Sequence, residues 1–310
     1  MTTPQTPRAP DLRRVGEWPT LLILALTYIV WAASTVWVAH ISVVLAVVLC
    51  ALAAAQHSSL THEALHGHPF RNPLLNGLLV FPALTLVVPY MRFRETHIAH
   101  HEDERLTDPY DDPETNYLDP KVWHRLPRWR KVLHGWNNTL AGRLLIGPII
   151  GQVAFMASDW AVIRKGTTWA LIGWLVHIPA AGLVIWWMMS VATMPIWAWL
   201  LSVYLALSIL KLRTYLEHQA HDACTARTAI VEDRGLFALL FLNNNLHVVH
   251  HMHPNVPWYA LPKLYRANRD GYLGVNQGYR YDTYSEIFRK HLFRAKDPVP
   301  HPLYRDGQAR

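Results

Sequence analysis

The chain has 310 residues, of which 51% are hydrophobic and only 16% charged, and its formal net charge is +7. A soluble domain usually has about a quarter of its residues charged, so the composition argues against a soluble globular protein. The basic residues lie between and beyond long apolar runs rather than in one patch. This pattern argues against a nucleic-acid partner and is typical of the cytoplasmic loops of integral membrane proteins.

The first apolar run predicts a transmembrane hairpin. Residues 1–17 include Arg8, Arg13 and Arg14 and are predicted to be a cytosolic tail. Residues 18–56 contain no Asp, Glu, Lys or Arg. The run is too long for a cleavable signal peptide. It is long enough for two crossings, because one helix needs about 20 residues. We expect helices over about 18–37 and 40–56.

The next region, residues 57–165, is predicted to be cytosolic and interfacial. It contains two weaker apolar stretches, 74–91 and 144–160, and by length either is a candidate for a further span. Pro82, Pro89 and Pro148 favour interfacial or re-entrant segments instead. Segment 104–114 is acidic and rich in turn residues, which predicts a surface loop, with a cap over a metal site as the alternative.

The second long apolar run, residues 166–212, predicts another hairpin that divides near 190–195. Neither of the two outer turns contains Lys or Arg, so both termini and residues 213–310 are expected on the cytoplasmic side. The sequence therefore predicts one all-α membrane domain over residues 1–310 with four transmembrane helices. A bacterial inner membrane is its expected location.

Ten of the chain's 19 histidines lie in four boxes. These are THEALHG with His62 and His66, ETHIAHH with His97, His100 and His101, YLEHQAH with His218 and His221, and NLHVVHH with His247, His250 and His251. On a helix, positions i, i+3 and i+4 share one face, so each box can direct its imidazoles at one point. One such box often arises by chance. Four boxes beside predicted cytoplasmic helix ends indicate a metal centre, because clustered imidazoles near hydrocarbon are costly unless they are paired.

Nine of these histidines are too many for one metal ion, and they suit two ions with four or five ligands each. A closed zinc site has four ligands and usually includes Cys, whereas an all-nitrogen pair with exchangeable positions suits redox iron and O₂. We therefore expect two iron ions (Fe²⁺/Fe³⁺) with O₂ as co-substrate. A metal transporter or sensor is the alternative from another class, but its ligands are expected at mid-membrane. If all boxes share one site, 74–91 and 144–160 must each return to the same face.

The boxes resemble those of a known family. HEALHG, HIAHH and HVVHH are similar to the three histidine boxes of the membrane fatty acid desaturase superfamily, which includes alkane hydroxylases and carotenoid ketolases. HHMHPNVPWYALPKLYR is similar to the continuation of box three in bacterial desaturases, and YLEH resembles an extra histidine motif that precedes it. The likeness covers roughly residues 18–266, and three boxes in this order are a specific signal.

The resemblance implies four transmembrane helices under a cytosolic helical cap that holds two irons. It implies O₂-dependent removal of hydrogen from an unactivated C–H bond. The ligands it implies are His62, His66, His97, His100, His101, His218, His247, His250 and His251. At the extra motif, Glu217 and His221 are the alternatives to His218.

The resemblance also implies a reaction and its partners. The expected function is a desaturase that introduces a double bond into a fatty acyl or lipid-like chain. The alternative is a hydroxylase, ketolase or oxidative decarboxylase on the same scaffold. No glycine-rich loop for a nicotinamide or flavin is evident. Electrons are therefore expected from an external carrier, a ferredoxin, rubredoxin or cytochrome b5-like protein, with its reductase.

Several polar residues adjoin the boxes. Carboxylates often accept a hydrogen bond from the second nitrogen of a metal-bound histidine. Glu217 is the preferred candidate for this role. Further candidates are Glu63, Asp222, Glu102 and Asp103, although all are also compatible with exposed charges. Residues 243–245, all Asn, are expected to cap the helix of box three.

Overall fold

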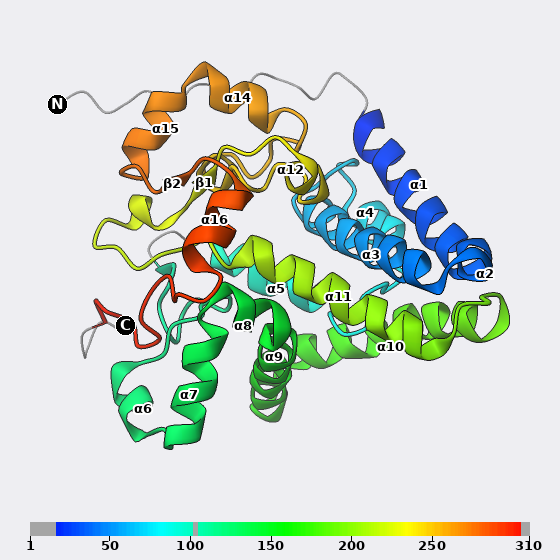
Figure 1. Cartoon of the computed structure of the whole chain (residues 1–310), viewed down its shortest axis with the longest axis horizontal. Coiled ribbons are helices and arrows are strands. Elements are labelled where there is room, and N and C mark those ends of the chain that lie inside the picture. Colours follow the sequence, from blue (N-terminus) through cyan, green and yellow to red (C-terminus); the bar gives the residue numbers. More distant parts are fainter. Residues whose placement is uncertain (1–16, 102–104, 305–310) are drawn as a thin grey trace. The chain divides into compact units, whose positions relative to one another are not determined.

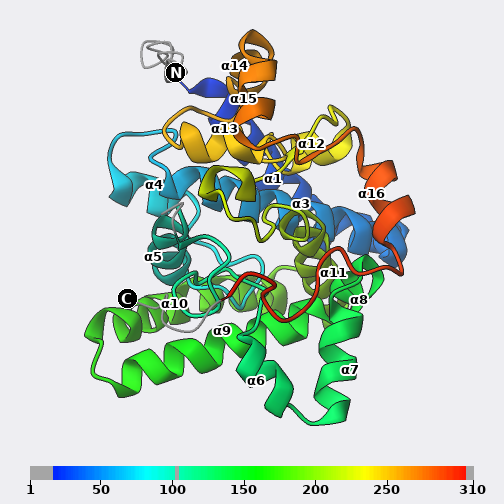
Figure 2. The same cartoon turned by 90° about the vertical axis from the view of Figure 1, so that its left-hand side faces the viewer.

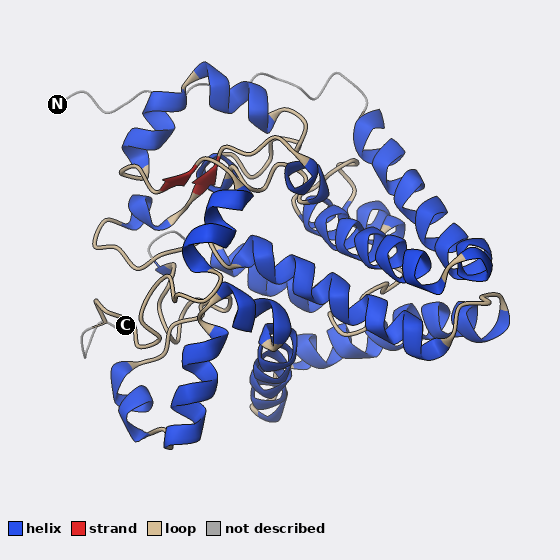
Figure 3. Ribbon diagram, in the orientation of Figure 1, coloured by secondary structure: helices blue, strands red, loops and turns tan. Residues whose placement is uncertain are grey.

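The computed structural model describes residues 17–101 and 105–304. Within these ranges most of the chain is helical (Figure 3), and the regular strands are β1 (Ile230–Val231) and β2 (Arg280–Tyr281), which pair in parallel. The predicted all-α fold is confirmed. The expectations for the N-terminal tail, Glu102 and Asp103 lie outside the described residues, except that Glu17 is described.

The described chain folds as two compact units. The membrane unit comprises residues 17–95 and 147–211, and the histidine unit comprises the described residues of 96–146 and 212–304. The boundary falls inside two helices, α5 (Tyr90–His100) and α11 (Ile196–Thr214). The single domain expected over the whole chain stays a prediction.

Four described helices are long and apolar enough to cross a membrane, as the sequence predicted. They are Trp18–Ile41, Val43–Leu65, Thr168–Ser190 and Ile196–Thr214. The first consists of α1 (Trp18–Ala33), the π-helical turn η2 (Ser34–Val38) and α2 (Ala39–Ile41); the second is α3 (Val43–Leu65) and the third α10 (Thr168–Ser190). The protein is therefore a membrane protein.

The first hairpin turns later than expected, and its second helix continues further. The turn is at Ser42, which is extended and whose side chain accepts a hydrogen bond from the Leu45 N–H. No Gly or Pro interrupts the chain between 34 and 41, so the first helix runs on. The second helix continues from 57 to Leu65 because hydropathy marks the limit of the bilayer and not the end of a helix. This extension places His62 on α3.

Inside the membrane unit, α1 packs against α3, and α10 packs against α9 (Gly147–Arg164), as Figure 1 shows. Ala46, Ala54 and Ala55 on α3 are fully buried. Small residues allow the backbones of membrane helices to approach closely. The Trp187 Nε1–H donates to Thr35 Oγ1 at 3.1 Å.

The two weaker apolar stretches, 74–91 and 144–160, are not among the four candidate spans. The first contains α4 (Pro73–Leu79) and an irregular segment, residues 80–89. Irregular backbone at membrane depth must find partners within the protein. The Ala83 N–H donates to Ala180 O at 3.3 Å, and the carbonyls of Leu86 and Val87 accept from His177 Nε2 at 2.7 Å and Gln152 Nε2 at 2.8 Å. The second stretch lies mostly in α9.

The histidine unit is built of short elements around a small core. Its further helices are α6 (Pro120–Arg125), α7 (Arg128–Asn137), α8 (Leu140–Leu145), η4 (Cys224–Arg227), α12 (Leu236–Leu240), α13 (His247–Met252), α14 (Leu261–Ala267), α15 (Arg269–Val275) and α16 (Tyr284–His291). Ile230, Val248, Val249, Leu261 and Tyr272 belong to one buried cluster. Helix α13 packs on β1. It also packs on α14, which packs on α15 (Figure 2). This core fixes the helix that carries box three.

Candidate metal centre

Four imidazoles of the histidine unit converge on one point. One ring nitrogen from each of His100, His218, His247 and His251 lies within 4.8 Å of the others. His218 Nε2 lies 2.8 Å from His100 Nε2 and 3.0 Å from His247 Nε2. The His251 ring is centred 4.6 Å from that of His247. We call these four residues the His100 cluster.

The cluster joins three segments that are distant in the sequence. His100 is the last residue of α5, and His247 and His251 are one turn apart on α13. The extra motif is not helical, contrary to our expectation, because α11 ends at Thr214. His218 instead forms an isolated antiparallel bridge with Thr228. Backbone partners on the neighbouring extended segment replace the helical hydrogen bonds there.

The structure separates His218 from His221. His218 is in the cluster, whereas His221 lies outside it, and His221 Nδ1 accepts a hydrogen bond from the Ala223 N–H at 3.1 Å. The main chain on both sides of His218 is held in place. The Gln219 N–H donates to Arg227 O, and the Ala229 N–H donates to Glu217 O, both at 3.0 Å.

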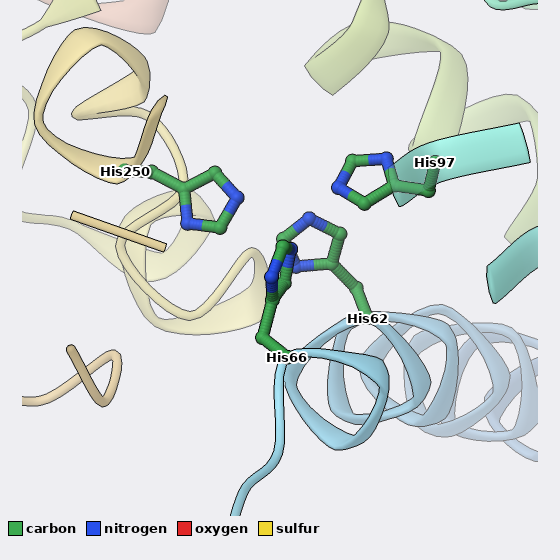
Figure 4. A group of neighbouring side chains, drawn as sticks. All are labelled: His62, His66, His97 and His250. Carbon is green, nitrogen blue, oxygen red and sulfur yellow. The ribbon is translucent and has the colours of Figure 1, made fainter. Parts of the chain in front are cut away.

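Three more box histidines lie beside this cluster in the same unit. The rings of His97 and His250 are stacked with centroids 6.3 Å apart, and both side chains are buried (Figure 4). His101 Nε2 lies 3.0 Å from His97 Nε2. The His101 ring is also stacked on His251, with centroids 4.3 Å apart. The side chains of boxes two and three therefore contact each other both inside and outside the His100 cluster.

Box one lies in the membrane unit. His62 is on the last turns of α3 and His66 is its C-cap residue, and their rings are centred 4.9 Å apart. Figure 4 shows both side chains projecting from the same end of this helix. The His62 ring lies 6.4 Å from the ring of Phe93. The spacing i, i+4 therefore has the effect that the sequence predicted, one shared helix face.

Two carboxylates that were not among the candidates from the sequence accept hydrogen bonds from ligand histidines. His100 Nδ1 donates to Asp112 Oδ1 at 2.7 Å, with both side chains buried, and His97 Nδ1 donates to Glu114 Oε1 at 3.0 Å. Metal-bound histidines commonly donate their second nitrogen in this way, which fixes the ring and leaves Nε2 for the metal. Asp112 is itself held by the Thr107 N–H, which donates to Oδ2 at 2.8 Å.

Both carboxylates come from the acidic segment 104–114, for which we expected a surface loop. Its tip, Tyr110 and Asp111, is exposed, but Asp112 is buried. The alternative expectation, a segment that closes over the histidines, describes this part better. The only signal in the sequence was the density of acidic and turn residues.

Glu217, the carboxylate that we preferred as a hydrogen-bond partner of a ligand histidine, is buried but reaches His247 only through Asn244. Its Oε1 accepts from Asn244 Nδ2 at 2.7 Å and lies 3.1 Å from Arg213 Nε. The distance to His247 Nδ1 is 3.7 Å, beyond a hydrogen bond. His247 Nδ1 instead donates to Asn244 Oδ1 at 3.3 Å. Asn244 therefore connects the carboxylate to the ligand candidate.

Other expected neighbours have different roles. Asp222 is exposed, and Glu63 is buried on α3 beside His62. The expected Asn caps are wrong, because the N-cap of α13 is Leu246 and no side chain caps it. Asn245 donates to Val231 O at 2.6 Å instead. Asn244 and Asn245 fill buried polar positions, a use that sequence alone does not distinguish from capping.

Burial and the carboxylates set the protonation of the cluster. Burial lowers the pKa of His218 and His247 well below the usual value, so each presents a neutral ring with one lone pair. Burial also acts to lower the pKa of His100, but the carboxylates of Glu114 and Asp112 outweigh it and raise that pKa to about 9. A basic imidazole is also a strong electron-pair donor to a metal ion that replaces its proton.

The cluster fits a metal ion. One ring nitrogen has either one proton or one lone pair, so His218 Nε2 can be satisfied by only one of its two close imidazole neighbours. A cation between the rings accepts a lone pair from each of them. The donors are all nitrogen and include no Cys, a set of ligands that suits iron, copper, nickel and zinc.

The membrane unit contains a cavity of about 260 Å³ lined mainly by apolar side chains. It lies between α3, α4, the irregular segment and α10, and its lining includes Thr61, Leu78, Leu84, Phe93 and Val176. Thr61 precedes His62, and Phe93 is the ring that lies beside it. The buried His57 also lines the cavity, and the Tyr28 hydroxyl lies 3.0 Å from its Nε2. The cavity therefore comes close to box one.

The fold and the site together define a helical membrane protein with clustered histidines that could hold a metal. Residues 35–283 match the family model for fatty acid desaturases. Over 213 residues the chain is 25% identical to a beta-carotene ketolase from Paracoccus sp. (strain N81106 / MBIC 01143), covering 66% of this chain and 71% of that protein. The chain belongs to the fatty acid desaturase family, as the boxes predicted, and it is an oxidoreductase.

Proposed function

We propose that the protein is an O₂-dependent di-iron enzyme that oxidises an apolar, lipid-like substrate. The observation that carries the proposal is the His100 cluster, four converging imidazoles of which one has a buried carboxylate behind it. His100, His218, His247 and His251 are assigned to one iron. When bound, the iron pair would supply the activation of O₂ that C–H cleavage requires.

The second iron is assigned to His97, His101 and His250 together with His62 and His66. The first three lie side by side in the histidine unit. His62 and His66 lie in the membrane unit, and their share in this site is assigned from the histidine-box pattern alone. The nine ligands expected from the sequence are thus retained in the proposal.

The residues behind the ligands hold them in place. Asp112 and Glu114 accept the Nδ1 protons of His100 and His97, so they orient both rings with Nε2 forward. Glu217 orients Asn244, which in turn accepts the Nδ1 proton of His247. These positioning groups are all buried or partly buried, which limits reorientation of the rings.

The cavity in the membrane unit is proposed to bind the apolar part of the substrate. Its walls are apolar side chains that exclude water, and it comes close to the residues that flank His62. We propose a fatty acyl or similar lipid chain as substrate and desaturation as the reaction. Oxidation of a ring-bearing isoprenoid is the second candidate, because the matched relative is a beta-carotene ketolase. Hydroxylation and oxidative decarboxylation remain further outcomes, since the product depends on how the substrate is placed.

Orientation and electron supply complete the proposal. The basic residues beside the spans favour a cytoplasmic location for both termini and the histidines in a bacterial inner membrane. Electrons are proposed to come from a separate ferredoxin, rubredoxin or cytochrome b5-like protein with its reductase.

The test compares wild type with His250→Ala in a host that supplies candidate lipids and an electron donor. Mass spectrometry of total fatty acids and neutral lipids is expected to show a new product that His250→Ala does not form. Loss of two hydrogens identifies a desaturase, gain of one oxygen a hydroxylase, and gain of one oxygen with loss of two hydrogens a ketolase.

His253→Ala is the matched control. His253 is also near box three, but the Tyr272 hydroxyl lies 3.0 Å from its Nε2, and it is not among the clustered histidines. Iron analysis of both purified variants separates loss of metal from loss of substrate. If His250→Ala keeps both its iron and its product, the proposed iron site is wrong.

A further inference from the structure

A stripe of large apolar side chains on α7 faces outward. Trp129, Val132, Leu133 and Trp136 have the spacing i, i+3, i+4, i+7, so they form one face of the helix. Their exposed fractions are 61%, 65%, 36% and 43%. A surface helix of a soluble protein turns such a face toward the core. In the described part of the chain, the apolar face of α7 is exposed instead.

The helix is nevertheless firmly seated at its C-terminal end. Asn137 is buried, and its carbonyl accepts from Arg143 Nε at 3.1 Å. Asn138 donates through Nδ2 to Asp297 O, and the Tyr215 hydroxyl donates to Asn138 O at 3.1 Å. The outward direction of the stripe is therefore set by the packing of this end and is not a consequence of a loose helix.

The flanks of the stripe are uniformly basic. Residues 120–138 contain no Asp or Glu and five cationic side chains, Lys121, Arg125, Arg128, Arg130 and Lys131. The Arg130 guanidinium lies 5.1 Å from the centre of the Trp129 ring. Lys131 Nζ donates to His124 O at 2.9 Å and lies 5.9 Å from the Trp123 ring. Indole rings and cations thus alternate along α6 and α7.

We propose that α6 and α7 form an interfacial anchor that binds an anionic phospholipid surface. Helices that lie in the membrane interface combine an apolar face with Trp and a polar face rich in Lys and Arg. Trp is enriched at the headgroup level, and cations near it are attracted by anionic lipids. The stripe from Trp129 to Trp136 is about 10 Å long by the helical rise, enough for its rings to reach the acyl boundary along two turns.

An acidic electron-donor protein is the other partner that the charge fits. It is disfavoured because contacts that steer such partners are mainly polar and depend on rim charges, whereas this surface presents four large apolar side chains in a row. The proposal does not depend on the identity of the metal or of the reaction. It concerns a surface of the histidine unit that none of the box residues shares.

The experiment uses the full-length protein in lipid vesicles. A fluorophore sensitive to polarity is attached at Val132→Cys in a Cys224→Ser background, since Cys50 is buried. Vesicles are phosphatidylcholine alone or phosphatidylcholine with phosphatidylglycerol. We expect nitroxide-labelled lipid to quench this probe severalfold more strongly in the anionic vesicles, and acrylamide to quench it less there.

Arg130→Cys is the matched control on the same helix, about 110° away from the centre of the stripe at 100° per residue. It is exposed and is expected to remain accessible to acrylamide in both vesicles. The triple variant Arg128→Glu, Arg130→Glu, Lys131→Glu, labelled at Val132→Cys, is expected to lose the difference between the two lipid mixtures.

Two results would overturn the anchor. One is equal acrylamide quenching of the Val132→Cys and Arg130→Cys probes in both lipid mixtures. The other is a Val132→Cys probe that becomes shielded only when a reduced acidic ferredoxin is added, which would make this surface a protein docking site. Iron content and membrane insertion, measured on the same samples, establish that each variant is folded.

Discussion

Two buried histidines, His177 in the membrane unit and His100 in the histidine unit, satisfy their ring nitrogens in opposite ways. In the membrane unit, His177 Nε2 donates to the Leu86 carbonyl at 2.7 Å, and its role is to hold an irregular segment. In the histidine unit, His100 donates backward to Asp112 and presents Nε2 to other imidazoles. A buried histidine bonded to a carbonyl is structural, whereas one backed by a carboxylate and facing other histidines is equipped to bind a metal.

The same contrast applies to buried charge. Arg92 and Asp159 in the membrane unit form a bidentate pair, with Nε and Nη2 at 3.0 and 2.8 Å from the two carboxylate oxygens, and Trp174 donates to Asp159 at 2.8 Å. That network is complete within itself. In the His100 cluster, His218 Nε2 faces two imidazole nitrogens and can pair with only one of them, so the two regions should respond differently to substitution.

The largest effect is expected at His218. His218→Ala should lose about half of the bound iron and all turnover, because the variant removes one of the four nitrogens that converge. His221→Ala is the control, since His221 lies outside the His100 cluster and its Nδ1 accepts a hydrogen bond from the Ala223 N–H. Iron stoichiometry and product formation are the measurements. Equal loss in both variants would show that the structure separates these two histidines incorrectly.

The next effect is on stability, in the membrane unit. Asp159→Ala leaves the Arg92 guanidinium buried without its main carboxylate, and we expect a loss of about 3–5 kcal/mol. Glu95→Gln removes the other carboxylate from the same guanidinium, but that carboxylate is partly exposed, so its effect should be much smaller. Thermal unfolding in detergent measures both. A similar loss in the two variants would contradict the idea of a closed buried network.

Asp112→Asn tests the positioning carboxylate. The change keeps the size of the side chain but weakens its hold on the Nδ1 proton of His100, and we expect metal affinity or activity to fall about 10–100-fold. Asp111→Asn, on the exposed tip of the same segment, should have no effect. Titration with ferrous iron distinguishes weakened metal binding from misfolding, and an unchanged iron affinity in Asp112→Asn would remove the positioning role.

The smallest effect is expected at Glu232, which belongs to none of the boxes and lies between the extra motif and box three in the sequence. Its hydrogen bond from Arg269, with further ones from Tyr265 and Arg280, lowers its pKa from 4.5 to about 2 in the folded protein. This contribution to stability is therefore present above pH 4.5 and is lost as the pH falls toward 2. Wild type should be slightly more stable than Glu232→Gln at neutral pH, and the difference should shrink over that range. A constant difference would show that the charge of Glu232 is not its source.

Local properties of the sequence determined much of this protein. The four spans follow from apolar runs, because transfer into hydrocarbon is summed residue by residue. That His62 and His66 share one face, and that His247 and His251 share another, follows from their i, i+4 spacing, because helical geometry repeats regardless of context. The boxes also carried the family, which the match over residues 35–283 confirmed.

Tertiary structure alone decided the partners. His100 and His218 are 118 residues apart and meet at 2.8 Å, and the choice of His218 over His221 depends on an extended backbone that the motif did not predict. Asp112 and Glu114 look like loop acids until the chain places them behind two imidazoles. The outward stripe of α7 has the same pattern as a core helix, and only its surroundings give it a different meaning. Periodicity gives the face of a helix, whereas contacts between distant segments decide what that face meets.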